Sequence, residues 1–216
     1  MATPMTRAAR KRRTREALME AALRLMSEGR SFTGIGLREV AREAGVVPTA
    51  FYRHFRDMDE LGLALVEEGG TTLRRLLREA RRDGLPASDV IRNSVRIYKS
   101  YLAEHPREFL FVASERSGGS PVIRAAVRRE VYHFAREMAH DLRALGYLPH
   151  LATETLQMIC GLVVNVMLSA AADILDLPPD QPRAEEELID TFVRQLRLIF
   201  LGAAAWREDR GGGRGG

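Results

Sequence analysis

Cysteine, aromatic residues and long apolar runs are all scarce in this sequence of 216 residues. The single cysteine, Cys160, cannot form an internal disulfide, which excludes a secreted disulfide scaffold and favours a reducing compartment. The longest apolar stretch covers residues 158–172 and is interrupted by Asn165 and Ser169, so it falls short of the ~20 apolar residues of a membrane-spanning helix. No apolar segment follows the basic N-terminus, so no signal peptide is expected. We therefore expect a soluble, cytoplasmic protein with no membrane partner.

Positive charge is concentrated at one end of the chain, although the net charge is only +4. Residues 1–56 contain 12 Lys and Arg against 5 Asp and Glu, whereas residues 57–216 contain 21 against 24. A local excess of this kind attracts nucleic acid or an anionic membrane regardless of sequence. The charge therefore predicts a polyanionic partner for the N-terminal region and does not name it.

Alternating apolar and polar residues, the pattern of a half-buried strand, are also missing. Apolar residues instead recur at helical spacing along almost the whole chain, which predicts an all-α fold of about nine helices. We expect three short helices up to residue 56 and six more behind them. The predicted division is a basic flexible arm over residues 1–13, a helix-turn-helix domain over 14–56, a larger helical domain over 57–206 and a disordered tail over 207–216.

Two short helices flank Gly45, and this arrangement predicts a helix-turn-helix motif. Glycine suits the turn because the turn commonly requires a positive φ, which costs other residues ~1–2 kcal/mol. Pro48 suits the first turn of the second helix, where its missing N–H group costs nothing. In such motifs the second helix lies in the major groove with its first residues nearest the bases.

The second helix supplies most of the predicted DNA contacts. Thr49 offers a hydroxyl and a methyl group, and Arg53 can pair with guanine, whereas Tyr52 and His54 are expected to bind phosphates. The basic residues of the arm would follow the duplex or enter a minor groove. The predicted DNA-binding residues are Arg10, Lys11, Arg12, Arg13, Thr14, Arg38, Pro48, Thr49, Ala50, Tyr52, Arg53 and His54. A basic N-terminus is equally typical of a solvated tail, and the spacing of Phe51 and Phe55 favours the core.

Several short motifs follow one another along residues 14–62. They are Thr14-Arg15, Ala21-Ala22-Leu23, Leu37-Arg38-Glu39-Val40-Ala41-Arg42-Glu43-Ala44-Gly45-Val46, Phe51-Tyr52-Arg53-His54-Phe55 and Asp59-Glu60-Leu61. This succession resembles the DNA-binding domain of TetR-type repressors. Further motifs, Glu115-Arg116-Ser117-Gly118 and Arg124-Ala125-Ala126-Val127, are similar to the subgroup that regulates unsaturated fatty acid synthesis, the FabR and DesT kind.

The resemblance implies a transcriptional repressor, not an enzyme. Such a protein binds a palindromic DNA operator as a homodimer, which pairs through the last two helices, and its larger domain encloses a ligand. For the subgroup, the genes are those of fatty acid desaturation, the effector is a long-chain acyl-coenzyme A, and no metal or cofactor is needed. A repressor of drug efflux with a different hydrophobic effector is the alternative, which acidic residues in the pocket would favour. An occupant would act through the long helix that starts near Met58.

Two positions depart from the family pattern at helix starts. Gly36 stands where the family usually has Ser or Thr before the second helix, and Val47 replaces the usual cap of the recognition helix. Each change could cost up to ~1 kcal/mol of capping energy. We expect these departures to affect affinity more than function.

A long acyl chain requires an apolar tunnel, and a coenzyme A head requires cations at its mouth. The predicted tunnel residues are Ile97, Tyr101, Phe109, Phe134, Met138, Met158 and Val163. The predicted head-group residues are Arg116, Arg124, Arg128 and Arg129, which surround a loop leading into a helix N-terminus. Ordinary core packing and a solvated helix face explain these two sets equally well.

Two Glu-x-x-His units, at Glu130 and His133 and at Glu137 and His140, have the ligand spacing of dimetal sites in helix bundles. They suggest a helical dimetal oxidoreductase as a remote alternative. Such sites take their units from different helices, however, whereas both units here lie on one predicted helix. We therefore favour a polar flank beside the core and predict no metal site.

Overall fold

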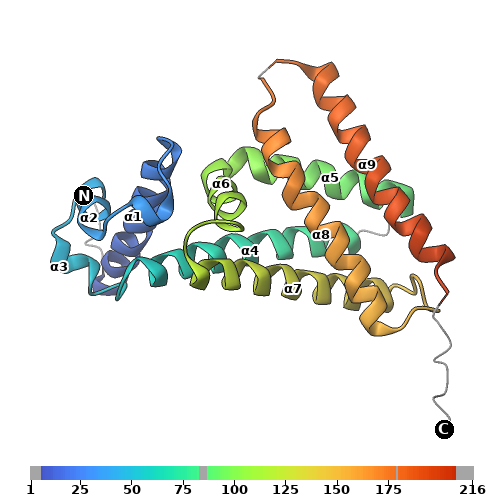
Figure 1. The fold of residues 1–216 in the computed structure, drawn as a ribbon, viewed down its shortest axis with the longest axis horizontal. Helices are drawn as coiled ribbons and strands as arrows, with labels where there is room; N and C mark the ends of the chain where they lie inside the picture. Colours follow the sequence, from blue (N-terminus) through green and yellow to red (C-terminus); the bar gives the residue numbers. More distant parts are fainter. Residues whose placement is uncertain (1–5, 83–86, 179, 208–216) are drawn as a thin grey trace, which may run out of the picture. The chain divides into compact units, whose positions relative to one another are not determined.

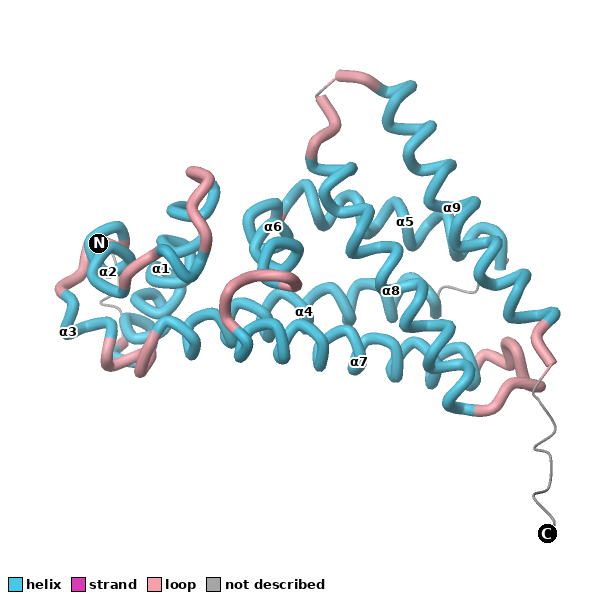
Figure 2. Tube along the Cα trace, viewed as in Figure 1, coloured by secondary structure: helices cyan, strands magenta, loops and turns pink. Residues whose placement is uncertain are grey.

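The computed structural model describes residues 6–82, 87–178 and 180–207. These residues form nine α-helices and a short 3-10 helix, η1 (Phe32–Gly34), and no strand is found among them. Figures 1 and 2 show helices joined mostly by short loops. The predicted all-α class is confirmed. The chain divides into two compact units, and the three boundaries between them fall within α4 (Met58–Arg82), after Thr71, between Glu104 and His105, and within α7 (Pro121–Ala144), after Arg129.

The first unit contains α1 (Arg7–Ser27), α2 (Leu37–Glu43), α3 (Pro48–Phe51), the start of α4, α6 (Pro106–Glu115) and the start of α7. Phenylalanine rings fill its core: Phe32 packs edge-on against Phe111 with ring centroids 5.2 Å apart, and Phe51 lies 5.7 Å from Phe55. All four rings are almost fully buried. The spacing of Phe51 and Phe55 therefore indicated the core correctly.

The second unit contains the rest of α4 and α7 together with α5 (Ala87–Glu104), α8 (Thr153–Leu175) and α9 (Pro182–Ala205). Helix α9 packs against both α8 and α5. The buried Tyr98 hydroxyl donates a hydrogen bond of 2.8 Å to the carbonyl of Met167, and burial raises the pKa of this phenol. The hydrogen bond fixes α5 against α8, because a buried hydroxyl needs a partner.

Helix ends follow the capping residues of the sequence. Asp57 Oδ1 accepts from the Glu60 N–H (2.8 Å) at the start of α4, and Glu60 Oε2 accepts in return from the N–H of Arg56 (2.6 Å), one residue before Asp57. Ser120 Oγ accepts from the Ile123 N–H (3.3 Å) at the start of α7. These side chains satisfy backbone donors that have no partner within the helix.

The start of α1 and the end of α3 differ from the prediction. Residues 7–13, expected in a flexible arm, are helical, because Thr6 caps α1 by accepting from the Ala9 N–H (3.2 Å) and because Arg and Lys are good helix formers. The third helix was expected within the residues up to 56, and α3 ends at Phe51, since residues 52–54 continue as turns. The predicted tail lies outside the described residues from residue 208 onward.

Candidate nucleic-acid interface and ligand pocket

Helices α2 and α3 are joined by the turn that the sequence predicted. Gly45 has a φ of +69°, its N–H donates to the Arg42 carbonyl (3.0 Å), and the Val46 N–H donates to the Ala41 carbonyl (2.9 Å). These two bonds form a Schellman motif, which requires a left-handed residue at the position of Gly45. The motif sets the angle at which the chain enters α3.

The two unusual caps have different consequences. At the start of α2, Glu39 Oε2 accepts from the Gly36 N–H (2.9 Å), while Arg30 holds Glu39 through bonds of 2.9 and 3.0 Å. The Arg30 guanidinium, and then the Gly36 N–H, lower the pKa of Glu39 to about 2. Glu39 therefore replaces the missing cap. Val47, at the start of α3, makes no side-chain capping bond and is 64% exposed.

The predicted base-reading residues lie on the surface of the first unit. Pro48, Thr49 and Arg53 are exposed, and Ala50 is half-buried. Tyr52 is 62% exposed, although its ring also contacts Phe51 edge-on at 6.1 Å. Arg38 on α2 is exposed as well. The buried Phe51 and Phe55 thus hold a segment whose intervening polar side chains reach solvent.

His54 is half-buried, unlike its neighbours. Its Nδ1 atom is buried and has no hydrogen-bond partner among the described residues. Burial, followed by the charges of Lys11, Arg15 and Arg53, lowers the pKa of the imidazole. At neutral pH this histidine is therefore uncharged, and it can offer a phosphate one hydrogen bond but no ion pair.

The basic residues before Thr14 extend along a helix. Arg10, Lys11, Arg12 and Arg13 are exposed on the first turns of α1, and the Thr14 hydroxyl donates to the Arg10 carbonyl (3.1 Å). The guanidinium of Arg15 lies 4.5 Å from the centre of the Phe55 ring. This cation–π contact connects the basic end of α1 to the residues that follow α3.

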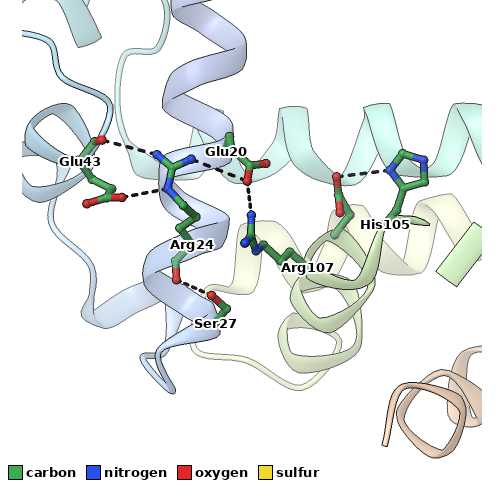
Figure 3. Close-up of polar contacts among 7 residues, drawn as sticks. Glu20, Arg24, Ser27, Glu43, His105 and Arg107 are labelled. Carbon is green, nitrogen blue, oxygen red and sulfur yellow. Dashed lines mark hydrogen bonds and ion pairs between the residues drawn. The ribbon is translucent and has the colours of Figure 1, made fainter. Parts of the chain in front are cut away.

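Ion pairs and hydrogen bonds attach α1 to α2 and α6, as Figure 3 shows. Arg24 Nε donates to Glu43 Oε1 (2.8 Å) at the end of α2, and Arg24 Nη1 lies 3.7 Å from Glu20. Glu20 also pairs with Arg107 at the start of α6. The Ser27 hydroxyl donates to the Arg24 carbonyl (2.7 Å). Helix α1 is therefore the element to which the neighbouring helices of this unit are attached.

A hollow of about 360 Å³ with polar and apolar walls lies in the same unit, where the end of α1 and α6 contribute Ser27, Arg107 and Glu115 to its lining. The Glu115 carboxylate is almost fully buried, and burial raises its pKa. A Cβ on Gly118 would lie only 2.2 Å from Glu115 Oε2, so a larger residue there would displace this carboxylate.

The four arginines predicted to bind a phosphate head lie near this carboxylate in sequence. Arg116, Arg128 and Arg129 are exposed, whereas Arg124 is half-buried and Arg124 Nη1 donates to the Gly118 carbonyl. All four belong to the first unit, as does the predicted tunnel residue Phe109, which is buried. The predicted head-group arginines thus share this loop with the buried Glu115, and Arg124 is already bonded to the backbone of the loop.

The second unit contains an apolar pocket of about 230 Å³. It is lined by Leu77, Val90, Ile91, Ser94, Met138, Leu142, Tyr147, Leu148, Val163, Met167, Leu196 and Phe200. Two predicted residues, Met138 and Val163, are among them. No charged side chain lines the pocket among the described residues. Such a lining suits an uncharged, apolar ligand or part of one.

Other predicted tunnel residues lie outside the described lining of this pocket. Tyr101 and Phe134 are buried in the second unit, Ile97 is half-buried, and Met158 is 55% exposed on α8. The residues that sequence reasoning missed come from five helices and from the loop between α7 and α8. Their apolar character gave no signal, since core residues share it.

The loop between α7 and α8 is held by Arg143, which donates to the carbonyls of Pro149 (3.1 Å) and Leu151 (2.7 Å). His150 Nε2 lies 3.3 Å from the Ala203 carbonyl on α9. The loop presents Tyr147 and Leu148 to the pocket, and Leu148 has a φ of +50°, which is uncommon for a residue with a side chain. Arg143 is thus a positioning residue for one wall of the pocket.

The two Glu-x-x-His units do not assemble a dimetal site. Glu130 pairs with Arg74, and Glu137 pairs with Arg78 and lies 3.6 Å from Arg74. Both histidines of the motif are exposed, and no group of three or more His, Cys, Asp or Glu side chains in the described part of the chain could hold a metal ion. The glutamates connect α7 to α4 within the second unit, beside the core as predicted.

Helices α8 and α9 carry exposed apolar side chains. Met158 and Leu162 on α8 and Leu198 and Leu201 on α9 are each at least 50% exposed. Helix α8 as a whole is long and apolar enough to cross a bilayer, with 39% of its most apolar window buried, so the prediction from the interrupted apolar run underestimated it. A core helix of a bundle passes the same test of length and composition.

Models of known protein families match both the N-terminal and the C-terminal part of the chain. Residues 18–65 match the family model of bacterial regulatory proteins of the tetR family, and residues 87–196 match that of the tetracyclin repressor-like C-terminal domain. The chain belongs to the TetR family. This TetR-type transcription regulator thus has the helix-turn-helix that the sequence predicted. These two matches identify the TetR family, and they do not distinguish the FabR and DesT subgroup within it.

Solved structures of TetR-type regulators share the fold at low identity. The fatty acid degradation regulator FadR from Bacillus halodurans is 16% identical, with a TM-score of 0.65 over 90% of this chain and 97% of that chain. FadR from Bacillus subtilis in complex with stearoyl-CoA is 12% identical, with a TM-score of 0.63 over 87% and 98%. AibR in complex with isovaleryl coenzyme A and operator DNA is 16% identical, with a TM-score of 0.58 over 85% and 97%. At these identities the likeness concerns the fold.

Proposed function

We propose that this TetR-type regulator is a cytoplasmic repressor that binds a palindromic operator and responds to an acyl-coenzyme A. The single observation that carries the proposal is the combination, in one chain, of a helix-turn-helix with exposed polar residues and a separate, uncharged apolar pocket. The first feature suits DNA and the second suits the apolar part of an effector. No catalytic step is required.

The DNA contacts divide by chemistry. Thr49 and Arg53 are exposed around α3 and can reach base edges, and Tyr52 can donate to a phosphate. The exposed cations of α1 would follow the backbone as a helix, which keeps their charges at fixed spacing along the duplex. His54 would add one neutral hydrogen bond. Arg38 on α2 is placed to contact a phosphate in the same way.

The homodimer would form through α8 and α9. Four of their apolar side chains are at least half exposed in the single chain, and burial of about 25 cal/mol per Å² of such surface favours pairing. Two-fold pairing of two helices from each subunit gives a four-helix bundle. A dimer also supplies the two recognition helices that a palindrome needs, about 34–36 Å apart.

The effector is proposed from the character of the pocket and from two relatives of the same fold. One of these relatives is bound to stearoyl-CoA and another to isovaleryl coenzyme A. An acyl chain suits the uncharged lining of the pocket. The resemblance of the sequence to the FabR and DesT subgroup predicts a long chain, and target genes in fatty acid desaturation.

A repressor of drug efflux is the competing proposal. Pockets that accept cationic drugs need an acidic side chain, since a buried cation requires a partner. The described lining of the pocket contains none, and its polar members are Ser94 and Tyr147. This observation favours the acyl effector.

The proposal is tested by titrating DNA from the upstream region of the gene itself, and from desaturation promoters, with the full-length protein. We expect salt-sensitive binding to a palindrome and a change of affinity when a saturated or an unsaturated acyl-coenzyme A is added. A monomeric protein with no preference for any palindrome would refute the DNA-binding part.

Variants assign the roles. Tyr52→Ala or His54→Ala should weaken binding to all DNA sequences, whereas Thr49→Ala should change the preference at particular bases. Tyr132→Ala, which removes an exposed tyrosine of α7, is the matched control. Equal loss on specific and random DNA would remove Thr49 from the base-reading set.

The head-group arginines are tested separately. If they bind the phosphates of coenzyme A, Arg116→Ala or Arg124→Ala weakens the acyl-coenzyme A response and leaves ligand-free DNA binding unchanged. An unchanged response in both variants would assign Arg124 the role of closing the loop at Gly118, to whose carbonyl it donates.

A further inference from the structure

The volume of the apolar pocket limits the length of chain that it can enclose. It measures about 230 Å³, and its buried wall includes Leu77, Leu142 and Leu196. An apolar cavity of about 150 Å³ holds one benzene molecule, which has six carbon atoms. At the same packing density this pocket holds about nine carbon atoms.

The polar members of the lining indicate where a chain would enter. Tyr147 is 37% exposed and Ser94 is half-buried, whereas Met138 and Val163 are buried. A thioester and its attached head would therefore remain on the side of Tyr147, the exposed member of the described lining. The buried residues would contact the hydrocarbon.

We infer that the pocket selects acyl thioesters with medium chains of about eight to ten carbon atoms. This inference rests on the proposed acyl effector and narrows it, and it differs from the long chain that the sequence resemblance predicts. Each methylene that enters the pocket tightens binding about fourfold, because its burial contributes about 0.8 kcal/mol. Once the pocket is full, further methylenes stay in water and add nothing.

Two residues set the limit. Met167 is half-buried in the wall, and its flexible side chain occupies space that a longer chain needs. Ser94 is a small side chain in the lining of the same pocket, so a larger residue there would reduce the volume. Truncating Met167 and enlarging Ser94 should therefore shift the preferred chain length in opposite directions.

The experiment measures the affinity of the full-length protein for saturated acyl-coenzyme A thioesters with even chains from four to eighteen carbons, with free coenzyme A as the control. We expect the dissociation constant to fall about fourfold per methylene up to about ten carbons, and then to level or rise. A continuous fall to eighteen carbons would overturn the length limit and leave the proposed effector class intact. Failure of every thioester to bind would overturn both.

Variants locate the limit in the pocket. Met167→Ala should move the optimum up by about two carbons and tighten binding of the twelve-carbon thioester about sixteenfold, whereas Ser94→Leu should move it down. Val122→Ala, which changes an exposed apolar side chain at the start of α7, should leave the optimum unchanged. An optimum that moves in neither pocket variant, with the helical content of both preserved, would show that another site measures the chain.

Discussion

The packing beneath the recognition segment and the packing around the apolar pocket differ in completeness, and the hollow of the first unit lies apart from Phe51 and Phe55, at the end of α1 and along α6. In the first unit, Phe51 and Phe55 are at most 1% exposed and pack ring against ring. In the second unit, side chains of the same kind, such as Phe200, surround unfilled space. A closed interior fixes the position of the residues that meet DNA, whereas an incomplete one leaves room for a ligand. Apolar side chains thus make the structure rigid in one place and leave room for a ligand in the other.

The largest effect should come from truncating a ring in each interior. Phe51→Ala leaves a new cavity in a closed core, so we expect a loss of about 3–5 kcal/mol in the free energy of unfolding and no DNA binding. Phe200→Ala enlarges an existing space and should cost clearly less. Urea denaturation of both variants measures the difference. Equal losses would mean that the pocket is collapsed in solution.

Ion pairs should show a second contrast. Arg74 and Glu130 in the second unit are 17% and 21% exposed, so Arg74→Met leaves a carboxylate in a poorly solvated place, at a cost of about 2–3 kcal/mol. The double variant with Glu130→Leu should recover most of this loss. Arg96→Met removes one cation of an exposed pair with Glu186 and should cost less than about 1 kcal/mol. Thermal unfolding of the three variants would test the ranking.

Glycines with positive φ should give equal stability losses and different functional losses. Gly45→Ala and Gly146→Ala each force a Cβ into a left-handed conformation and should cost about 1–2 kcal/mol. The first change lies beside α3 and should weaken DNA binding, whereas the second lies beside Tyr147 and should weaken ligand binding. Parallel DNA and acyl-coenzyme A titrations separate the two. Loss of DNA binding in both, at matched stability, would contradict the assignment.

The smallest effect is a dependence on pH in the first unit. The pKa of Glu39 is lowered to about 2 by Arg30 and then by the Gly36 N–H, whereas an unperturbed glutamate has a pKa of 4.5. A group with a depressed folded pKa stabilises the protein above its unfolded pKa, and this contribution is lost as pH falls from 4.5 toward 2. Glu39→Gln should therefore lower the melting temperature at pH 7 and have little effect near pH 2. Glu187→Gln on α9 is the control.

Local signals in the sequence predicted the helices and their ends well. Asp57, Ser120 and Gly45 act through atoms within a few residues, so their capping and turn geometry can be read directly from the sequence. The start of α1 could have been found in the same way, because Thr6 precedes a run of helix formers. The strong charge of residues 7–13 suggested a solvated arm instead.

The pocket could not be predicted, because it depends on how helices rotate against each other. Met138 and Val163 were found, but Met158 has the same chemistry one and a half turns earlier on α8 and is exposed. Pairing of Glu130 and Glu137 with Arg74 and Arg78 joins helices far apart in the sequence, and neither spacing nor composition selects those partners.

Phe111 and Ile123 complete the buried cluster that contains Phe51 and Leu18, although they follow the recognition segment by some sixty or seventy residues. The DNA-binding domain is therefore not a self-contained module that ends at residue 56. A chimaera that exchanges only residues 1–56 with a relative would bring foreign side chains against these two, and grafting a new operator preference would require both to be redesigned with it.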